Sequence, residues 1–318
     1  MSPTLDRSSD SPSRIDPAAH PYTSDFAGLM KSIKSAGLLR RRHGYYGVLA
    51  SILTVVLGMT VTGMIFLGSS WWSVALAPPL AIVLTQFAFL AHELAHKAVF
   101  ASGSSNDIWG RIIANLVVGI SYSWWMNKHS RHHGNPNTVG KDPDIESDVV
   151  VFREDIAPTT TGLQRAIVKR QGWLFFPLLT LEGLNLHIQG FKSAFSRKKI
   201  EARGSEITML LSRHIILFGL WDWFMPWGVA SVFIVTQLAV FGVYMGASFA
   251  PNHKGMPIIG RDVKVDFLRR QVLTSRNITG GTAMDLAMGG LNYQIEHHLF
   301  PNMPRPALAK AAKMVKAY

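Results

Sequence analysis

Four long apolar stretches alternate with polar, basic segments along the chain. They cover about residues 46–68, 71–92, 207–227 and 229–250. A helix rises about 1.5 Å per residue, so each stretch is close to the roughly 30 Å needed to cross a bilayer core. Trp71-Trp72 follows the first stretch and Trp227 follows the third, as is typical of a membrane interface. The pattern therefore predicts four transmembrane helices arranged as two hairpins.

The remaining segments are too polar to span a membrane. Residues 1–40 are rich in Ser, Pro and Asp and are predicted to be a disordered cytosolic tail. Residues 41–318 are expected to form a single membrane domain, in which 93–206 and 251–318 build a helical cap in the cytosol. Within the cap, 108–125 is predicted to be an amphipathic helix on the inner membrane surface. The apolar stretch 173–191 has basic residues on both sides and is interpreted as interfacial or re-entrant.

The distribution of charge supports this topology. The net charge is +12, but no Lys or Arg occurs between His43 and Lys97 or between Arg213 and Lys254. Such long gaps argue against a nucleic-acid partner, whereas basic loops on the cytoplasmic side are typical of membrane proteins. Both termini and the cap are thus predicted to be cytoplasmic. The chain has no cysteine, so thiolate-bound clusters and disulfides are excluded within it.

Histidines gather in three short clusters that lie far apart in the sequence. These are His92-Glu93-Leu94-Ala95-His96, His129-Ser130-Arg131-His132-His133 and Gln294-Ile295-Glu296-His297-His298. In a helix, the spacing of the first cluster puts both imidazoles on one face, one turn apart. Adjacent histidines in the other clusters diverge enough to bind two different metals. All three clusters fall at or near cytoplasmic ends of predicted spans, which favours a shared metal site.

The number of histidines indicates two metal ions. His253, at the end of the fourth predicted span, brings the total to eight, and one metal takes at most about three to five ligands. His187 is a ninth candidate ligand, and a hydrogen-bonded histidine in a half-buried helix is the alternative. Carboxylates able to orient imidazole N–H groups are Glu93, Glu296, Asp142 and Asp144. For the two aspartates, a solvated loop position is an equally good interpretation.

The first cluster also matches the H-E-x-x-H pattern of zinc metalloproteases, in which Glu93 would be the general base. An intramembrane zinc protease is therefore an alternative function. It leaves the other two clusters unexplained, and it needs a further ligand from an aspartate in a later span. Asp222 lies instead at the predicted outer turn.

The three clusters, in this order and with these spans between them, resemble the histidine boxes of the membrane fatty-acid desaturase family over roughly residues 40–310. The resemblance implies an all-α integral membrane fold with four spans and a cytosolic cap. It also implies two non-haem iron ions held mainly by the histidines of the boxes, with His253 as a further ligand. The activity implied is an oxidoreductase that uses O2 and external electrons to introduce a cis double bond into a long-chain acyl group.

Two departures refine the resemblance. The first box has three intervening residues and the third opens with Gln294, a pattern similar to front-end and bacterial desaturases. Gln294 either leaves one metal less ligated or is compensated by His187. The haem-binding His-Pro-Gly-Gly of a fused cytochrome b5 does not occur.

These features lead to the remaining expectations. The electron donor is expected to be external, a ferredoxin or an NAD(P)H-dependent reductase. The substrate is expected to be a long-chain acyl-CoA or acyl-lipid at the lipid bilayer, which is predicted to be a bacterial inner membrane. A related alkane or lipid hydroxylase is a further alternative, because it shares the first hydrogen abstraction.

Overall fold

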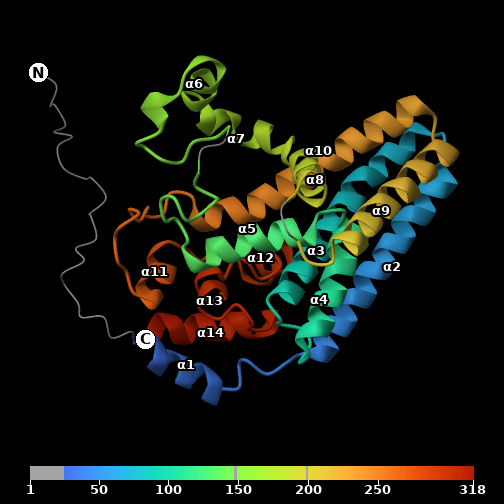
Figure 1. The fold of residues 1–318 in the computed structure, drawn as a ribbon. Helices are drawn as coiled ribbons and strands as arrows, with labels where there is room; N and C mark the ends of the chain where they lie inside the picture. The colour runs from blue at the N-terminus through green and yellow to red at the C-terminus, as the bar shows by residue number, and fades with distance from the viewer. Residues whose placement is uncertain (1–24, 147–148, 198–199) are drawn as a thin grey trace, which may run out of the picture.

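The computed structural model describes residues 25–146, 149–197 and 200–318, and helices joined by loops make up the fold of these residues (Figure 1). No β-strand occurs among these residues, which confirms the predicted all-α class. The α-helices are α1 (Phe26–Ser35), α2 (His43–Leu67), α3 (Ala77–Ala95), α4 (Gly103–Arg111), α5 (Tyr122–Gly134), α6 (Gly162–Val168), α7 (Gln171–Leu179), α8 (Glu182–Ala194), α9 (Arg203–Phe224), α10 (Trp227–His253), α11 (Phe267–Leu273), α12 (Gly281–Ala287), α13 (Gln294–Leu299) and α14 (Arg305–Ala317). The 3-10 helices η1 (Trp71–Leu76) and η3 (Ala157–Thr159) and the π-helix η2 (Ile112–Val118) complete the set.

Three helical segments are long and apolar enough to cross a membrane: α2, the continuous stretch Trp71–Ala95 that contains α3, and α10. The most apolar part of α2 is only 17% buried, against 56% for the stretch with α3. Helix α3 is therefore the central element, while most of the surface of α2 is exposed. The third predicted span, 207–227, corresponds to α9, which is not among these segments and which contains the charged residues Glu206, Arg213 and Asp222.

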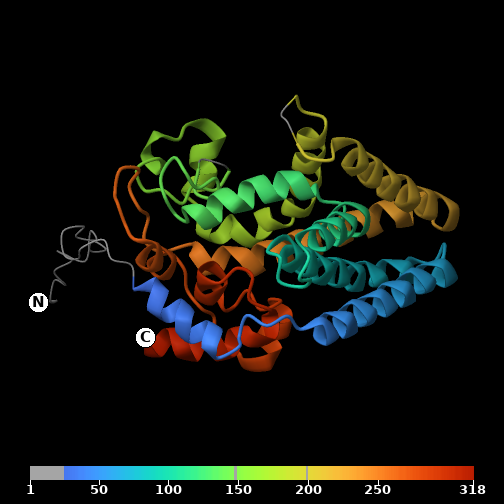
Figure 2. The same cartoon turned by 60° about the horizontal axis from the view of Figure 1, so that its bottom comes forward.

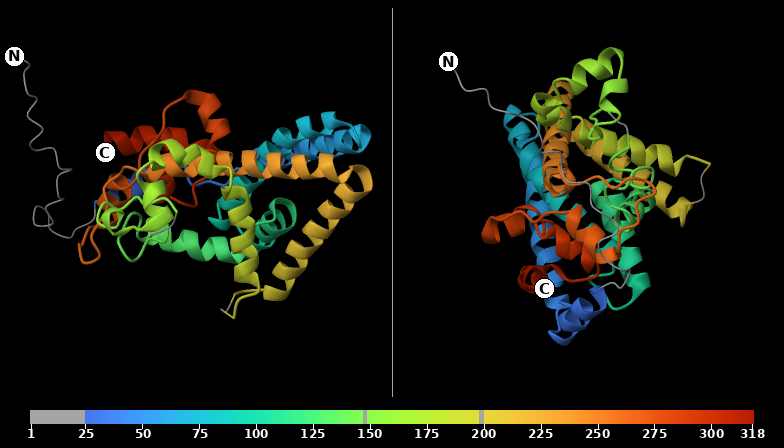
Figure 3. Two further views of the ribbon diagram at one scale, coloured as in Figure 1. Left: turned by 90° about the horizontal axis from the view of Figure 1, so that it is seen from above. Right: turned by 90° about the vertical axis from the view of Figure 1, so that its left-hand side faces the viewer.

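The long helices extend away from the helices that contain the histidine clusters. Helices α2, α3, α9 and α10 reach to one side of the molecule, and α5 and α11–α14 gather at the other end (Figures 1 and 3). Helix α10 packs against both α3 and α8. The histidines of α3 and α10 lie at the ends of these helices, so the packing of α10 on α3 places them at the same level.

The structure corrects one predicted helix. The segment 108–125 is divided into α4, η2 and α5, because Gly119 adopts a left-handed conformation with φ of 89° that ends the helix. A side chain at Gly119 would also collide with the Arg213 guanidinium. The apolar segment 173–191, interpreted as interfacial or re-entrant, contains most of α7 and α8.

Helix α8 crosses α10 at very close range. A Cβ atom at Gly183 would lie 2.2 Å from the backbone oxygen of Leu238, and one at Gly242 would lie 2.3 Å from that of Leu179. Only glycine permits this approach of two backbones. The crossing fixes α7 and α8 beside the middle of α10, where they form one wall of a cavity described below.

The predicted disordered tail contains a helix. Residues 1–24 lie outside the described residues, but α1 occupies part of the remainder and places Leu29 and Ile33 in a second core beneath α14. Phe26 stacks on Phe300 with a centroid distance of 5.6 Å, and α1 lies beside α14 in Figure 2. The prediction was wrong here because the apolar face of α1 is short and its partner is at the other end of the chain.

Replacing Ile33 by alanine is expected to weaken the docking of α1. The side chain is fully buried, and truncating such a residue costs about 2–5 kcal/mol of stability. Limited proteolysis of the detergent-solubilised protein should show faster cleavage within residues 25–42. The matched control is Lys34→Ala, at an exposed position of the same helix; equal protection of both variants would contradict the docking.

Candidate metal centre

The histidines of the first cluster end the central helix. His92 lies in the last turn of α3, and His96 is the residue that caps its C-terminus. Their rings are 4.7 Å apart between centroids. The Nε2 atom of His129, on α5, lies 3.1 Å from that of His92 and 2.8 Å from that of His96. Two helices far apart in sequence thus direct three ring nitrogens at one point.

The eight histidines of the boxes and of α10 form two separate groups of converging nitrogens. The first group consists of His92, His96, His129, His133 and His297. The second consists of His132, His253 and His298. Within each group the potential ligand atoms all lie within 4.8 Å of one another. Adjacent histidines of α5 and α13 fall in different groups, as the divergence of neighbouring side chains on a helix predicts.

Hydrogen bonds fix the tautomers of the second group. His132 Nδ1 lies 3.0 Å from Asp142 Oδ2, His253 Nδ1 lies 2.8 Å from the carbonyl oxygen of Thr274, and His298 Nδ1 lies 2.9 Å from Gln271 Oε1. A carboxylate and a carbonyl only accept, so each Nδ1 must be the protonated nitrogen. The Nε2 atoms therefore present lone pairs.

A cation placed between these lone pairs would satisfy them. His132 Nε2 and His253 Nε2 are 3.2 Å apart, and when both rings are neutral with Nδ1 protonated their lone pairs face each other. His298 Nε2 is buried and has no hydrogen-bond partner among the described residues. Buried polar atoms are normally satisfied, so both observations fit a metal ion bound by imidazole. The donor set, all nitrogen, suits Fe, Zn, Cu or Ni.

Burial keeps the first group ready to bind metal. It holds the pKa of His129, His133 and His297 well below its ordinary value, and the neighbouring imidazoles add to the effect. The pKa of His96 is lowered to about 3 by burial and by the charge of Lys97. Neutral rings are the form that ligates metals.

The carboxylates proposed to orient imidazoles have different roles. Asp142 is fully buried and, besides its contact with His132, accepts a hydrogen bond from the backbone N–H of Asn137 at 2.7 Å. Asp142 is therefore a buried hydrogen-bond partner of the candidate ligand His132 and not a solvated loop residue. Asp144 lies 3.4 Å from His132 Nδ1 and also pairs with Lys128. Glu296 instead accepts from Asn277 Nδ2 at 2.7 Å.

Glu93 is directed away from the ring nitrogens. Its carboxylate pairs with Arg305 (Nη2 to Oε2, 2.6 Å) and accepts from the Tyr46 hydroxyl at 2.9 Å. Both partners are buried. A carboxylate held in a salt bridge is a poor general base, so the H-E-x-x-H zinc protease interpretation is not favoured.

His187 does not join either group, which corrects its prediction as a ninth ligand. Its Nδ1 donates to the carbonyl oxygen of Gly183 at 2.7 Å, and its ring lies against His214 and Phe241. The alternative interpretation, a hydrogen-bonded histidine of a half-buried helix, describes the structure. Gln294 is the residue beside the second group: its Nε2 lies 2.8 Å from His253 Nε2.

Gln271 and Thr274 hold two imidazoles of the second group, and no sequence pattern indicated either residue. Gln271 donates from Nε2 to the carbonyl oxygen of His133 at 3.1 Å, which turns its Oε1 toward His298. Both residues are fully buried. In the structure, Gln271 is marked by its complete burial on the short helix α11. Burial cannot be predicted from the sequence of so short a helix.

Replacing Gln271 by leucine is expected to weaken the second metal position selectively. Loss of such an outer partner typically costs about 10- to 100-fold in metal affinity. Titration with a chelator should remove about one metal per chain earlier than in the parent protein. Gln189→Leu, on α8 and outside both groups, is the matched control; simultaneous loss of both metals would contradict the assignment.

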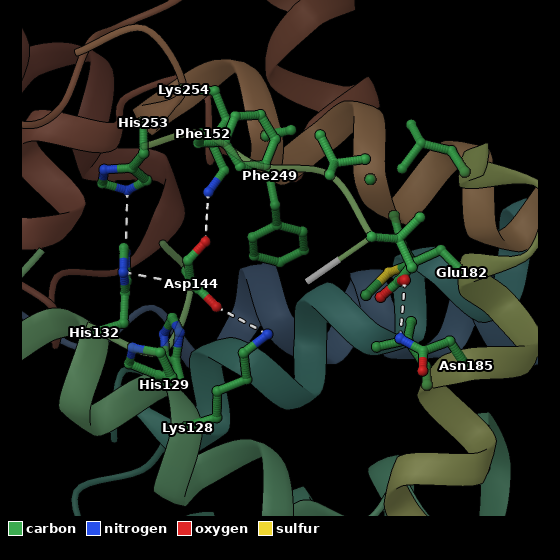
Figure 4. Close-up of a pocket in the computed structure, with 18 of the residues that line it drawn as sticks. Lys128, His129, His132, Asp144, Phe152, Glu182, Asn185, Phe249, His253 and Lys254 are labelled. Carbon is green, nitrogen blue, oxygen red and sulfur yellow. Dashed lines mark hydrogen bonds and ion pairs between the residues drawn. The ribbon is translucent and has the colours of Figure 1, made fainter. Parts of the chain in front are cut away.

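A cavity of about 500 Å³ leads to the two groups. Its volume is within the roughly 300–1,000 Å³ typical of ligand sites. His129, His132, His253 and Gln294 line it. In Figure 4 these histidines lie at one side, Glu182 and Asn185 lie at the other, and Phe249 is between them. The remaining walls are mainly apolar and come from α5, α7, α8 and α10 and from residues 143–146 and 149–152.

Comparison with known proteins gives a consistent result. Residues 69–318 match the family described as "Fatty acid desaturase". The chain is 27% identical to a Delta(8)-fatty-acid desaturase of Helianthus annuus, with 88% of this chain and 64% of that protein covered. It is 31% identical to an acyl-lipid (9-3)-desaturase of Physcomitrium patens (75% and 47% covered) and 28% identical to the Delta(6)-fatty-acid desaturase fat-3 of Caenorhabditis elegans (92% and 68%).

The chain thus spans about two thirds or less of the length of these relatives. All three relatives are from eukaryotes, so they lend no support to the predicted bacterial membrane.

Proposed function

The chain belongs to the fatty acid desaturase family, and on this premise we propose that it is an O2-dependent acyl desaturase with two iron ions. The observation that supports the proposal is the convergence of eight histidines into two groups at the end of an apolar cavity. His92, His96, His129, His133 and His297 would hold one iron. His132, His253 and His298 would hold the other, with Gln294 next to it.

The bound irons would supply the activation of O2 that removal of hydrogen from an unactivated methylene requires. In the overall reaction, the acyl chain loses two hydrogen atoms from neighbouring carbons. O2 takes up these hydrogens, two external electrons and two protons, and is released as water. The electrons come from a separate redox protein, a ferredoxin or an NAD(P)H-dependent reductase.

The chain's own residues position the substrate and exclude water. Trp125 stacks on His129 with a centroid distance of 4.3 Å, and Phe249 borders the cavity beside His92 at 6.1 Å between rings. Together with α7 and α8 these rings leave an apolar passage that fits methylene groups. Asp142 and Gln271 keep the protons of His132 and His298 on Nδ1.

The topology we propose has four membrane spans, with α9 as the third, and with the termini and metal centre on the cytoplasmic side. The three apolar helical segments and the family support a membrane protein. The concentration of basic residues outside the apolar segments supports the orientation. Neither alternative function is favoured: Glu93 is bound by Arg305, and the matched relatives are named desaturases, not hydroxylases.

Expression in a host of known lipid composition tests the proposal. New cis double bonds are expected in the fatty acids by gas chromatography and mass spectrometry, and they should vanish in His297→Ala. The purified protein should contain about two irons per chain. An unchanged fatty-acid profile with a competent electron donor, or zinc in place of iron, would contradict the proposed function.

A further inference from the structure

Two large apolar side chains lie at the rim of the cavity. Leu181 and Val149 both line the cavity, yet their exposed fractions are 61% and 48%. A ligand that enters past them meets hydrocarbon first. An apolar entrance gives no favourable contacts to the large polar head of a water-soluble substrate. An entrance that opens into lipid is expected to be apolar.

Helix α7, which covers the cavity, is apolar on two faces. Phe175, Leu178 and Leu179 line the cavity. Trp173 and Phe176 point outward, with exposed fractions of 89% and 59%. A helix that is hydrophobic all round is typical of a lipid environment.

The residues directly before α7 add a positive charge to this surface. Lys169 and Arg170 are exposed and lie outside the cavity lining. Basic residues followed by exposed aromatic residues are typical of helices that lie in the membrane interface. Helix α7 is thus placed to separate the cavity from the bilayer.

The charged groups inside the cavity do not favour binding of a polyanionic headgroup such as that of coenzyme A. Among the described lining residues, only Lys128 and Lys254 are permanent cations, and three carboxylates accompany them: Asp144, Glu146 and Glu182. Lys128 Nζ pairs with Asp144 Oδ1 at 2.8 Å, and Lys254 Nζ donates to the Asp144 backbone oxygen at 2.6 Å (Figure 4). No arginine lines the cavity among these residues.

Lys254 is the less available of the two cations. Its Nζ lies 4.0 Å from the centre of the Phe152 ring and donates a hydrogen bond to the backbone oxygen of Asp144. Recognition of several phosphates needs free guanidinium or ammonium groups, and the cavity does not offer them.

We propose that the acyl chain reaches the metal centre while it is esterified to a membrane lipid, and that it enters sideways from the bilayer beneath α7. The head of the lipid stays at the interface, beside Lys169 and Arg170. A coenzyme A thioester is not the preferred carrier. This inference rests on the proposed function, since it names the form in which the desaturase receives its substrate.

The experiment compares two carriers of one acyl chain. The iron-loaded full-length protein is reconstituted in phosphatidylcholine vesicles and reduced by an excess of ferredoxin and its reductase. The acyl chain that is desaturated in the expression host is presented either as a phosphatidylcholine ester in the vesicle or as its coenzyme A thioester. Double bonds are counted after saponification.

We expect the phosphatidylcholine ester to be converted at least about tenfold faster, a preference that corresponds to about 1.4 kcal/mol. Equal or faster conversion of the thioester would overturn the inference and leave the proposed function intact. Conversion of neither carrier would contradict the proposed function and the inference with it.

Two sets of variants test the route and the charges. Trp173→Ser with Phe176→Ser should lower conversion of the vesicle ester about fivefold or more by weakening the interface contact, with unchanged iron content. Trp72→Ser, an exposed tryptophan at the turn between α2 and α3, is the matched control. Glu146→Lys with Glu182→Lys should raise conversion of the thioester several-fold through added cations. An equal effect of all these changes on both carriers would contradict lateral entry.

Discussion

His129→Ala is expected to abolish desaturation and to remove iron from the first metal position. The Nε2 atom of His129 is the shared neighbour of His92 and His96, at 3.1 and 2.8 Å. Loss of an outer partner of a ligand already costs about 10- to 100-fold in metal affinity, so loss of the ligand itself should exceed this range. Plasma mass spectrometry of the purified variant should show at most about one iron per chain, and the lipids of the host should show no new double bonds.

Two other histidines provide the controls. His43 is exposed at the start of α2, and His43→Ala should keep both metals and full activity. His187→Ala should also keep both metals, because His187 is absent from both groups. Loss of iron from His187→Ala, or an unaffected iron content in His129→Ala, would contradict the assignment of ligands.

Arg305→Leu is expected to have the largest effect on stability. Arg305 begins α14 and makes two contacts with Glu93, Nη2 to Oε2 at 2.6 Å and Nε to Oε1 at 3.2 Å. Both side chains are buried. Breaking a buried pair by removal of one partner leaves an unpaired charge and typically costs about 3–5 kcal/mol. The variant should therefore unfold at a clearly lower temperature in detergent, as followed by circular dichroism.

A double-variant comparison separates the unpaired charge from lost packing. Adding Glu93→Gln to Arg305→Leu removes the buried carboxylate charge, and the amide can still accept from Tyr46. The double variant should recover part of the lost thermal stability. Lys313→Leu, at an exposed position of α14, should have little effect. If the double variant is as unstable as the sum of the two single variants, Arg305 does not stabilise the fold through Glu93.

This ion pair also links the first and third histidine boxes. Glu93 follows the ligand His92 directly, and Arg305 begins the helix after the third box. Tyr46 of α2 joins them, because its hydroxyl also accepts from the Arg305 backbone N–H at 3.1 Å. The network therefore holds three elements at one end of the bundle, where both metal groups lie.

The sequence by itself determined the elements whose physical cause is local. A run of about 20 apolar residues predicts a membrane-length helix wherever it occurs, and three of the four predicted spans have that length and apolarity in the structure. The spacing of His92 and His96, and the adjacency of His132 and His133, predict which imidazoles share a direction and which diverge. The structure places them in this way, in the two groups described above.

Only the tertiary structure decided which residues meet across long stretches of chain. His187 was a candidate ligand from the sequence, but α8 crosses α10 at Gly183 and Gly242, and the His187 ring is bonded to the Gly183 carbonyl oxygen, away from both groups. Gln271 has no distinguishing local pattern, and it orients His298 because α11 packs on α13. Helix α1 is too short to be stable alone and is held by α14, more than 250 residues away. Helical spacing acts over one or two turns, whereas these contacts depend on how whole helices pack.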